Sequence, residues 1–460
     1  MKLPLETLVE SAHAEVRNRE RLPESASISS DTRTLAPGEL YVALRGENFD
    51  GHAFVGDAFE RGAAGAVVSD PRVLPAGAPA LIVAETLGAY QAYAAHARAL
   101  LAAPVIAVTG SAGKTTTKEF IAQLLERSGF SPLAVTPANE NNEFGVPKLF
   151  LGIEPNVRAV VVEFGARHPG DILPLARIGR PDVAVVTNIG EAHLEIMGSR
   201  EKLAATKFEI FATGAQPVLN FDDDASRARG ATQEREPWWF AVRGRAAKAL
   251  PKGRVVALLG RETLVVREPG ETRHYAIECS IPGDHNLPNV AAAVAAALAA
   301  GAPAQAVAGA ITSLTLPAGR YERLRAGDFD VIFDAYNASM SGTLATLGSF
   351  ALESASRKIA VLGSMAELGS DAPAMHERVG AAAAASGLAA LLVGGDHAAD
   401  LARGARTAGF PEERIFAFTD VARAVEWLRA NGRAGDVVLL KASRRYHLED
   451  ILHSLRAAHA

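Results

Sequence analysis

The sequence has little or none of several features that mark particular classes of protein. Cys279 is the single cysteine among 460 residues, which excludes an internal disulfide and a cysteine-rich zinc site. The formal charge of -5 supplies no net positive field, so we expect no nucleic-acid partner. The longest apolar runs are too short to cross a bilayer, and the first residues lack the apolar core of a signal peptide. These absences predict a cytoplasmic protein that is not inserted in a membrane.

The composition is typical of a folded chain with more than one core. Hydrophobic residues make up 48% of the sequence and charged residues 22%, a balance that is ordinary for globular proteins and unlike that of disordered ones. A chain of 460 residues exceeds what one hydrophobic core usually supports. We therefore expect two or three domains.

Short apolar runs divide the chain into three α/β units. Residues 1–102 contain brief strand-like pieces at 40–44, 66–68 and 81–83, separated by turn residues, which predicts a small N-terminal α/β domain. Within 103–317, Val105–Val108, Val160–Val162 and Val183–Val186 are continuous apolar runs, the mark of buried parallel strands. Strands alternating with helical patterns predict a doubly wound, mainly parallel sheet. After a hinge expected at Leu316–Gly319 the alternation restarts, with strands expected at 331–333, 359–362, 391–393 and 437–440 and a helix at 421–430. Residues 318–460 are therefore predicted to form a second Rossmann-like unit.

A glycine-rich turn follows the first of the central runs. Its sequence, Thr109 to Lys118, lies between a predicted buried strand and a helical pattern. Glycines let backbone amides face phosphate oxygens, Lys114 can reach the β and γ phosphates, and the Thr115 hydroxyl can ligate Mg²⁺. The spacing is shorter than the standard G-x-x-x-x-G-K-[ST], but the strand–loop–helix context favours nucleotide binding over a plain turn. The candidate phosphate-binding residues are Gly110, Ser111, Gly113, Lys114, Thr115 and Thr116.

Two further polar residues are predicted at strand ends of the same sheet. Glu163 follows Val160–Val162, and His193 follows the run at 183–186. Taken singly, each is an ordinary surface acid or loop histidine. Because the carboxyl ends of parallel strands share one edge of a sheet, we interpret the pair as ligands of a metal bound beside the phosphates.

Many ordered stretches of the chain resemble the Mur ligase family. The resemblance runs over essentially the whole chain. It is carried by Ser30–Arg33, Ala43–His52, Gly110–Lys118, Asn141–Pro147, Glu163–Ala166, Asn188–Glu195, Gly283–Asn286, Gly319–Arg320, Asp334–Ser339 and Gly363–Gly369. The resemblance implies an N-terminal domain that holds a UDP-sugar peptide, a central P-loop-type ATPase domain, and a C-terminal Rossmann-like domain that completes the ATP and amino-substrate sites.

The resemblance also assigns roles to individual residues. It implies that Ser30, Asp31, Arg33 and Arg45 contact the UDP end of the substrate, and that Thr136, Asn141 and Asn142 face the muramoyl portion or the phosphate. It places Asn286, Asn289, Arg320 and Asp334 around the nucleotide, and Tyr336 and Asn337 at the amino substrate. Without the family, most of these would read as helix caps or surface ion pairs.

Lys207 shows most clearly what the resemblance adds. From composition alone it is a lysine on a helix, which would prefer solvent. In the stretch Ala204–Phe211 it matches the family lysine that is carbamylated by CO₂. A carbamate would turn a cation into an anionic oxygen ligand for a second Mg²⁺.

The implied reaction is ATP-dependent amide ligation through an acyl phosphate. The block Asp334–Ser339 and the lack of an Asp-Asn-Pro-Arg run favour the dipeptide-adding member, with UDP-N-acetylmuramoyl-tripeptide and D-alanyl-D-alanine as substrates and ATP and Mg²⁺ as cofactors. Alternatives are a sister amide ligase, either the diamino-acid-adding enzyme or a folylpolyglutamate synthetase, and a P-loop ATPase switch that makes no bond. We expect a monomer.

Overall fold

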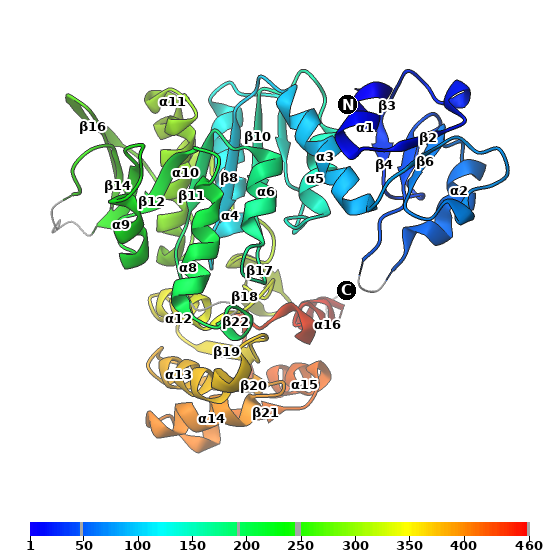
Figure 1. The fold of residues 1–460 in the computed structure, drawn as a ribbon. Coiled ribbons are helices and arrows are strands. Elements are labelled where there is room, and N and C mark those ends of the chain that lie inside the picture. Colours follow the sequence, from blue (N-terminus) through cyan, green and yellow to red (C-terminus); the bar gives the residue numbers. More distant parts are fainter. Residues whose placement is uncertain (47–48, 191–193, 244–249, 458–460) are drawn as a thin grey trace.

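The computed structural model describes residues 1–46, 49–190, 194–243 and 250–457, without the side chains of 194 and 195. Within these ranges the strands form sheets of five, nine and six strands, with a small two-stranded sheet made of β1 (Leu3–Pro4) and β3 (Ser25–Ala26). The three larger sheets follow one another along the chain and in space (Figure 1). The predicted α/β fold of three domains is confirmed. No helix of the described ranges is long and apolar enough to span a bilayer.

The N-terminal sheet has the strand order β2-β7-β6-β5-β4, parallel except for β2. The strands predicted at 40–44, 66–68 and 81–83 are present as β5, β6 and β7 and end within two residues of the prediction. The bounds are β2 Glu15–Arg17, β4 Ile28–Ser29, β5 Leu40–Val42, β6 Gly65–Val68, β7 Ala80–Ile82, α1 Leu5–Ala12, α2 Val55–Glu60 and α3 Thr86–Ala99.

The central sheet has the order β16-β15-β14-β13-β12-β11-β8-β10-β9. Its strands are parallel from β9 to β14, and β15 and β16 continue it as an antiparallel hairpin. The three predicted apolar runs are β8 (Val105–Thr109), β10 (Ala159–Glu163) and β11 (Val183–Val186). The other bounds are β9 Leu133–Val135, β12 Gln216–Asn220, β13 Trp238–Arg243, β14 Val255–Leu259, β15 Thr263–Glu268, β16 Glu271–Ala276, α4 Lys114–Arg127, α5 Gly145–Gly152, α6 Ile172–Gly179, α7 Leu194–Met197, α8 Arg200–Phe208, α9 Asp224–Gly230, α10 Leu287–Ala299 and α11 Ala304–Ala310.

The C-terminal sheet has the order β17-β18-β22-β19-β20-β21 and is parallel apart from β17. Each predicted strand of this region is present, and the helix predicted at 421–430 is α15. The bounds are β17 Glu322–Ala326, β18 Phe329–Phe333, β19 Lys358–Gly363, β20 Ala390–Gly394, β21 Ile415–Phe418, β22 Val437–Lys441, α12 Met340–Ala351, α13 Ala372–Ala384, α14 Ala398–Thr407, α15 Val421–Asn431 and α16 Glu449–Ala457.

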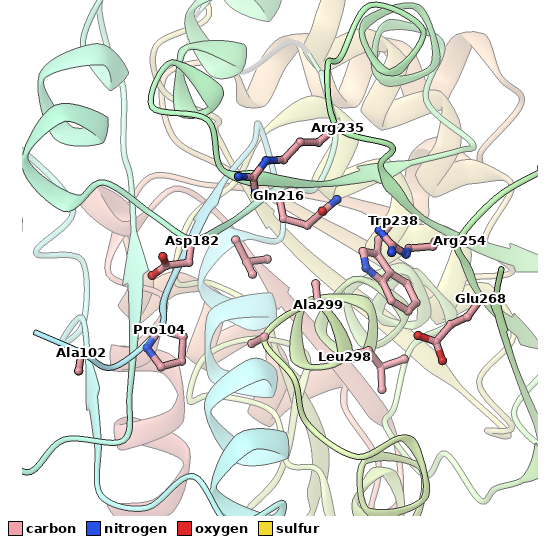
Figure 2. A pocket seen from close by; sticks show the side chains of 12 residues that line it. Ala102, Pro104, Asp182, Gln216, Arg235, Trp238, Arg254, Glu268, Leu298 and Ala299 are labelled. Carbon is pink, nitrogen blue, oxygen red and sulfur yellow. The ribbon is translucent and has the colours of Figure 1, made fainter.

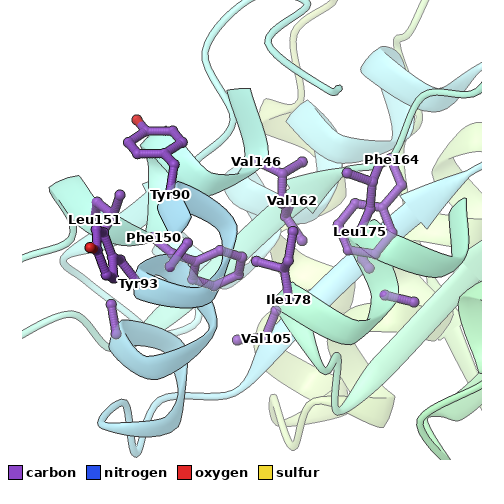
Figure 3. Close-up of a cluster of buried hydrophobic side chains, with 14 of the residues drawn as sticks. Tyr90, Tyr93, Val105, Val146, Phe150, Leu151, Val162, Phe164, Leu175 and Ile178 are labelled. Atoms are coloured by element: carbon purple, nitrogen blue, oxygen red, sulfur yellow. The ribbon is translucent and has the colours of Figure 1, made fainter. Parts of the chain in front are cut away.

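The hydrophobic cores do not divide in the same way as the sheets. One continuous cluster of buried side chains runs from the N-terminal sheet through α3 onto one face of the central sheet. Figure 3 shows its middle part, where Tyr90 and Tyr93 of α3 lie beside Phe150 of α5. The other face of the central sheet is covered by α4 and the alanine-rich α10, which have a separate cluster. The C-terminal sheet has two clusters of its own, one on each face.

Candidate active site

The loop between β8 and α4 has a backbone shape that requires glycine. Gly110 has φ +144° and Gly113 has φ +79°, a region that side chains rarely adopt. A Cβ on Gly113 would lie 2.3 Å from Oδ1 of Asn289, and one on Gly110 would lie 2.0 Å from the Thr187 hydroxyl. Both glycines are therefore fixed by neighbouring side chains as well as by their backbone conformation.

The polar residues after β11 hold this loop in place. Ala112 accepts bonds at its carbonyl from Thr187 Oγ1 (2.6 Å) and Asn188 Nδ2 (3.1 Å), and its amide donates to Asn188 Oδ1 (3.0 Å). The Ser111 amide donates to the Asn188 carbonyl (3.0 Å), and its hydroxyl accepts from the Gly190 amide (2.9 Å). The loop is thus held mainly by the side chains of Thr187, Asn188 and Ser111, and the Ala112 side chain takes no part.

The first turn of α4 presents free amides and a cation. Gly113 is the residue before the helix and provides no side-chain cap, so the amides of the first turn have no partner within the helix. Lys114 is half-buried and donates from Nζ to the Gly110 carbonyl at 2.8 Å. Burial and, secondarily, Arg320 lower the pKa of Lys114, whereas Glu163 raises it. Thr115 and the buried Thr116 complete a turn suited to an anion.

Glu163, at the end of β10, contacts both the phosphate loop and the segment that follows β9. It is the last residue of β10, not the residue after the strand as we had predicted, and it is 2% exposed. Its carboxylate accepts from Thr115 Oγ1 (2.9 Å) and Asn141 Nδ2 (2.8 Å). The Glu163 amide donates to Thr136 Oγ1 at 2.9 Å. A buried carboxylate is therefore aimed at the start of α4, as the predicted pairing of Glu163 with the loop requires.

Two asparagines before and within α10 adjoin the other side of the loop. Asn289 Oδ1 accepts from Thr117 Oγ1 at 3.4 Å, and Asn289 Nδ2 donates to Asn286 Oδ1 at 3.2 Å. Both asparagines are buried. The Asn289 amide lies next to Gly113 and Asn286 contacts Asn289, so the structure brings both predicted nucleotide residues to this side of the phosphate loop.

Residues of the C-terminal unit reach the same loop. Arg320 donates from Nη2 to Thr115 Oγ1 at 3.5 Å, and its guanidinium lies 4.1 Å from the centre of the Tyr336 ring. Burial lowers the pKa of Arg320, although Asp334 and Glu163 act against this. Gly190 lies between Ser111 and Ser341 of α12. A Cβ on Gly190 would be 3.2 Å from Cβ of Ser111 and 3.3 Å from the Ser341 hydroxyl.

The buried Asp334 side chain and the backbone of the exposed Asn337 are fixed by bonds within the C-terminal unit. The buried Asp334 carboxylate forms an ion pair with Lys441 (2.9 Å) and accepts from Thr346 Oγ1 (2.5 Å) and the Tyr321 amide (3.2 Å). Lys441 Nζ also donates to the Asn337 carbonyl at 3.0 Å. These bonds fix the backbone on either side of Tyr336.

Lys207 is 1% exposed, in the last turn of α8. This corrects the expectation from composition that it lies in solvent. Burial and the positive charge of Lys114 lower its pKa to about 7, whereas the carboxylates of Asp171, Glu163 and Glu209 raise it. Lys207 is thus close enough to Lys114 and Glu163 to respond to their charges. His193, its predicted companion in the metal site, lies outside the described residues.

The predicted UDP-contacting residues lie at the N-terminal sheet, away from the loop. Arg33 pairs with Asp31 at 2.7 Å, Arg45 pairs with Asp50 at 2.8 Å, and the Ser30 hydroxyl donates to Tyr90 at 3.4 Å. The Arg33 side chain lowers the pKa of Asp31 to about 2. Asn142 Oδ1 accepts from the amides of Phe144 (3.3 Å) and Gly145 (3.0 Å), so its side chain fixes the start of α5.

A cavity of about 560 Å³ lies at the opposite edge of the central sheet. Figure 2 shows it between Pro104, Asp182 and Gln216, which begin or precede β8, β11 and β12, and the end of α10 at Leu298 and Ala299. No predicted site residue lines it. Ligands of parallel α/β sheets bind at the carboxyl ends of the strands, so we assign the site to the loop edge and not to this cavity.

Comparison with known proteins identifies the family of this chain. Models of the Mur ligase family catalytic domain, the Mur ligase middle domain and the Mur ligase glutamate ligase domain match residues 24–120, 108–297 and 319–444. A UDP-N-acetylmuramoyl-tripeptide–D-alanyl-D-alanine ligase of Synechocystis is 35% identical over 98% of this chain and 97% of its own. One from Escherichia coli is 32% identical over 94% and 93%. The chain belongs to the Mur ligase family.

Solved structures show that the likeness of this Mur ligase extends to all three units. MurF from Acinetobacter baumannii superposes with a TM-score of 0.86 at 26% identity and covers 99% of both chains. The MurF ligase of Thermotoga maritima, solved in complex with ADP, has a TM-score of 0.78 at 26% identity and covers 94% of this chain and 97% of its own.

Some residues that shape the site of this Mur ligase were not found from its sequence. Thr187 and Asn188 hold the phosphate loop, and Thr346 and Lys441 fix Asp334. Thr187 and Asn188 directly follow β11, so their position at a strand end was an available signal. Thr346 lies within α12 and no local pattern marks it, because its role depends on how α12 packs against β18.

Proposed function

We propose that this Mur ligase uses ATP to join D-alanyl-D-alanine to UDP-N-acetylmuramoyl-tripeptide, releasing ADP and phosphate, in the cytoplasmic stage of peptidoglycan synthesis. The observation that carries the proposal is the cluster of Lys114, Thr115 and Glu163 at the loop edge, faced by Arg320 from the C-terminal unit. Relatives named UDP-N-acetylmuramoyl-tripeptide–D-alanyl-D-alanine ligase are similar over more than nine-tenths of the chain.

In the first step a peptide carboxylate attacks the γ-phosphorus of ATP, and ADP leaves. The product is an acyl phosphate. Lys114 and the free amides of α4 would neutralise the charge on the transferred phosphoryl group, and Arg320 would do so from the other side. Such transfer needs alignment and charge stabilisation more than covalent help from the protein.

In the second step the amine of the dipeptide attacks the acyl carbon and expels inorganic phosphate. The attacking nitrogen loses a proton as the amide forms. The site must therefore hold the amine next to the phosphate that Lys114 and Arg320 bind. Because Arg320 rests on Tyr336, we place the amine on the C-terminal side of the loop, where Tyr336 and Asn337 were predicted to contact it.

The residues around Thr115 suit Mg²⁺. The available donors are a threonine hydroxyl and a carboxylate, which are the hard oxygen ligands that Mg²⁺ prefers. No three His, Cys, Asp or Glu side chains cluster within the described ranges, so phosphate oxygens would supply the remaining positions. Thr115 and Glu163 would hold one ion, with His193 as a further predicted ligand. When bound, the metal would neutralise phosphate charge.

We further propose that Lys207 carries a carbamate that holds a second Mg²⁺. A neutral lysine amine adds to CO₂ and releases one proton. With a pKa of about 7, a large share of this amine is neutral near pH 7, which an exposed lysine would not be. The influence of the Lys114 and Glu163 charges on Lys207 supports a carbamate on the same side of the sheet as the phosphate loop.

The assignment of substrates to regions completes the proposal. Residues 1–102 would hold the UDP-sugar peptide through Ser30, Asp31, Arg33 and Arg45, with Thr136, Asn141 and Asn142 nearer the phosphate. Residues 103–317 would hold ATP, with Asn286 and Asn289 of this unit and Asp334 of the C-terminal unit around the nucleoside. Residues 318–460 would hold the amine, in a protein that acts as a monomer.

A phosphate-release assay with product mass spectrometry tests this function. Phosphate should appear only when ATP, UDP-N-acetylmuramoyl-tripeptide and D-alanyl-D-alanine are all present, and the product should gain the mass of the dipeptide minus water. Ligation of a diamino acid or of glutamate in place of the dipeptide would point to a sister enzyme. ATP hydrolysis that is independent of both substrates would instead point to a switch.

A further inference from the structure

The carboxyl edge of the C-terminal sheet carries several basic side chains, and nearly all have an acidic partner. Lys441, at the end of β22, pairs with the buried Asp334. Arg445 pairs with Asp396, which follows β20, and the Tyr446 hydroxyl donates to the same carboxylate. The histidines of this edge also face carboxylates: His397 is 2.7 Å from Asp400, and His447 is 3.4 Å from Glu449.

Within the described ranges, the half-buried Arg320 and the exposed Arg444 form no ion pair with a carboxylate at this edge. Arg444 is the one of the two that faces solvent. Its guanidinium instead lies 5.3 Å from the centre of the Tyr336 ring. A cation held over an aromatic face keeps its hydrogen-bond donors free for an external anion.

The Tyr336 ring ties Arg444 to the reaction centre. The same ring carries Arg320 at 4.1 Å, and Arg320 reaches Thr115 in the phosphate loop. The two ring distances bound the separation of the guanidinium carbons at about 9.4 Å. An extended dipeptide spans about 7 Å from its amine to its carboxylate. A dipeptide whose amine is at the phosphate therefore has a length that can bring its carboxylate to Arg444.

We propose that Arg444 binds the terminal carboxylate of the amine substrate and that Tyr336 is a positioning residue that holds Arg444 and Arg320 at the spacing of a dipeptide. This rests on the proposed function, because it requires a dipeptide as the amine. The arrangement selects a substrate that is an amine at one end and an anion one dipeptide away. Arginine suits this task because its planar fork can bind a carboxylate through two parallel hydrogen bonds.

The test compares D-alanyl-D-alanine with its C-terminal carboxamide, which has nearly the same shape without the charge. In the unaltered enzyme we expect kcat/KM for the carboxamide to be lower by about 10- to 100-fold, the loss of a charge-assisted contact. In Arg444→Ala, kcat/KM for the dipeptide should fall by a similar factor, mainly because KM rises. In the same variant, kcat/KM for the carboxamide should hardly change. The preference for the carboxylate should thus nearly disappear.

Arg445→Ala is the matched control, because Arg445 is adjacent but already paired with Asp396. It should keep the preference for the carboxylate. Tyr336→Phe retains the ring and should also keep it, whereas Tyr336→Leu should lose it together with part of kcat, since Arg320 is released as well. Circular dichroism and melting temperatures would establish that each variant is folded.

The outcomes separate this inference from the proposed function. If Arg444→Ala discriminates between carboxylate and carboxamide as the unaltered enzyme does, the inference is overturned and the ligase function stands. A raised KM for ATP with unchanged discrimination would overturn it in favour of a phosphate contact. If the unaltered enzyme ligates neither dipeptide, the proposed function itself fails.

Discussion

The N-terminal and C-terminal units are attached to the central sheet in very different ways. The N-terminal unit shares a hydrophobic core with it: α3 packs against α5 and α6 in one continuous buried cluster. The buried Arg98 adds bonds to the carbonyls of Gly179 (2.8 Å) and Arg180 (3.0 Å) and an ion pair with Asp182 (2.9 Å). Breaking this junction would expose a large apolar area and several buried polar groups.

The C-terminal unit meets the central sheet mainly through polar or small side chains. Its two apolar clusters lie within residues 321–455, and Leu316 at the expected hinge is partly buried against both the central cluster and one of these. The contacts between the units include His285 with Ser349 (2.8 Å), Arg320 with Thr115, and Gly190 with Ser341. Interfaces of this kind come apart at lower cost than a shared core. The comparison indicates one fixed junction and one that can open.

Two matched core substitutions test most directly whether the two junctions differ. Phe150 belongs to the cluster that joins the N-terminal and central sheets, and Phe350 to a cluster of the C-terminal unit. Each change to Ala should cost about 3–5 kcal/mol because both rings are fully buried. In hydrogen exchange, Phe150→Ala should accelerate exchange in both the N-terminal and central sheets. Phe350→Ala should accelerate it within 321–457 alone, and a response across the whole chain would contradict the proposed independence.

Removing Lys114 tests the part of the site that lies in the central unit. Lys114→Ala should raise the activation barrier by about 3–4 kcal/mol, comparable to the loss of one oxyanion-hole donor, with little change in melting temperature. The exposed pair of Lys148 with Glu140 provides a control, since Lys148→Ala removes a lysine of the same unit away from the phosphates. Turnover of Lys114→Ala within a few-fold of the unaltered enzyme would refute the role given to this residue.

The dependence of stability on pH tests the burial of Lys207. Its pKa is depressed from 10.5 to about 7, so the unfolded chain binds more protons between these values and stability should rise with pH across that interval. Lys207→Met should remove this rise, which chemical denaturation at several pH values would measure.

The same residue offers a readout that does not depend on activity. With ¹³C-bicarbonate, a carbamate NMR signal should grow as pH is raised from about 6 to 8, because the neutral amine becomes more abundant. Lys207→Arg should show no such signal and should be inactive, since a guanidinium stays protonated. A signal of equal size in Lys207→Arg would assign it to another amine, and an active Lys207→Arg enzyme would exclude the carbamate.

Small-angle scattering measures the smallest expected effect, closure of the C-terminal unit. With an ATP analogue and UDP-N-acetylmuramoyl-tripeptide together, the radius of gyration should decrease modestly, because Arg320 and the phosphate loop would then bind one ligand. The Arg320→Ala variant should compact less. An unchanged radius with both ligands bound would show that the second junction is as fixed as the first.

How far the sequence predicts this molecule depends on whether the signal is local. Buried parallel strands such as β8, β10 and β11 are continuous apolar runs, and the phosphate loop is a short contiguous pattern, so both were predicted. The strands β12 to β16 were missed. β16 (Glu271–Ala276) is mostly polar and exposed, so only its pairing with β15 identifies it as a strand. β13 and β14 are largely apolar runs, and for these the sequence did offer a local signal.

The site residues show the same division. Glu163 could be placed because it ends a strand, but the burial of Lys207 depends on how α8 packs against neighbouring helices such as α6, which no local pattern encodes. Arg444 was not among the predicted site residues for a related reason: an exposed arginine is common, and its position over Tyr336 joins residues more than a hundred positions apart. Long-range packing, not residue type, decides these cases.

The glycine between Ser111 and Ser341 sets a limit on what the interface tolerates. A single methyl group at Gly190 would press on both serines at little more than 3 Å, and it would act as a wedge between two parts that otherwise fold normally. We expect a substitution there to leave both units folded and to impair closure of the C-terminal unit. The protein would then accumulate in the cell without being active. A small molecule that inserted at this seam would produce the same state without competing with ATP for the phosphate loop.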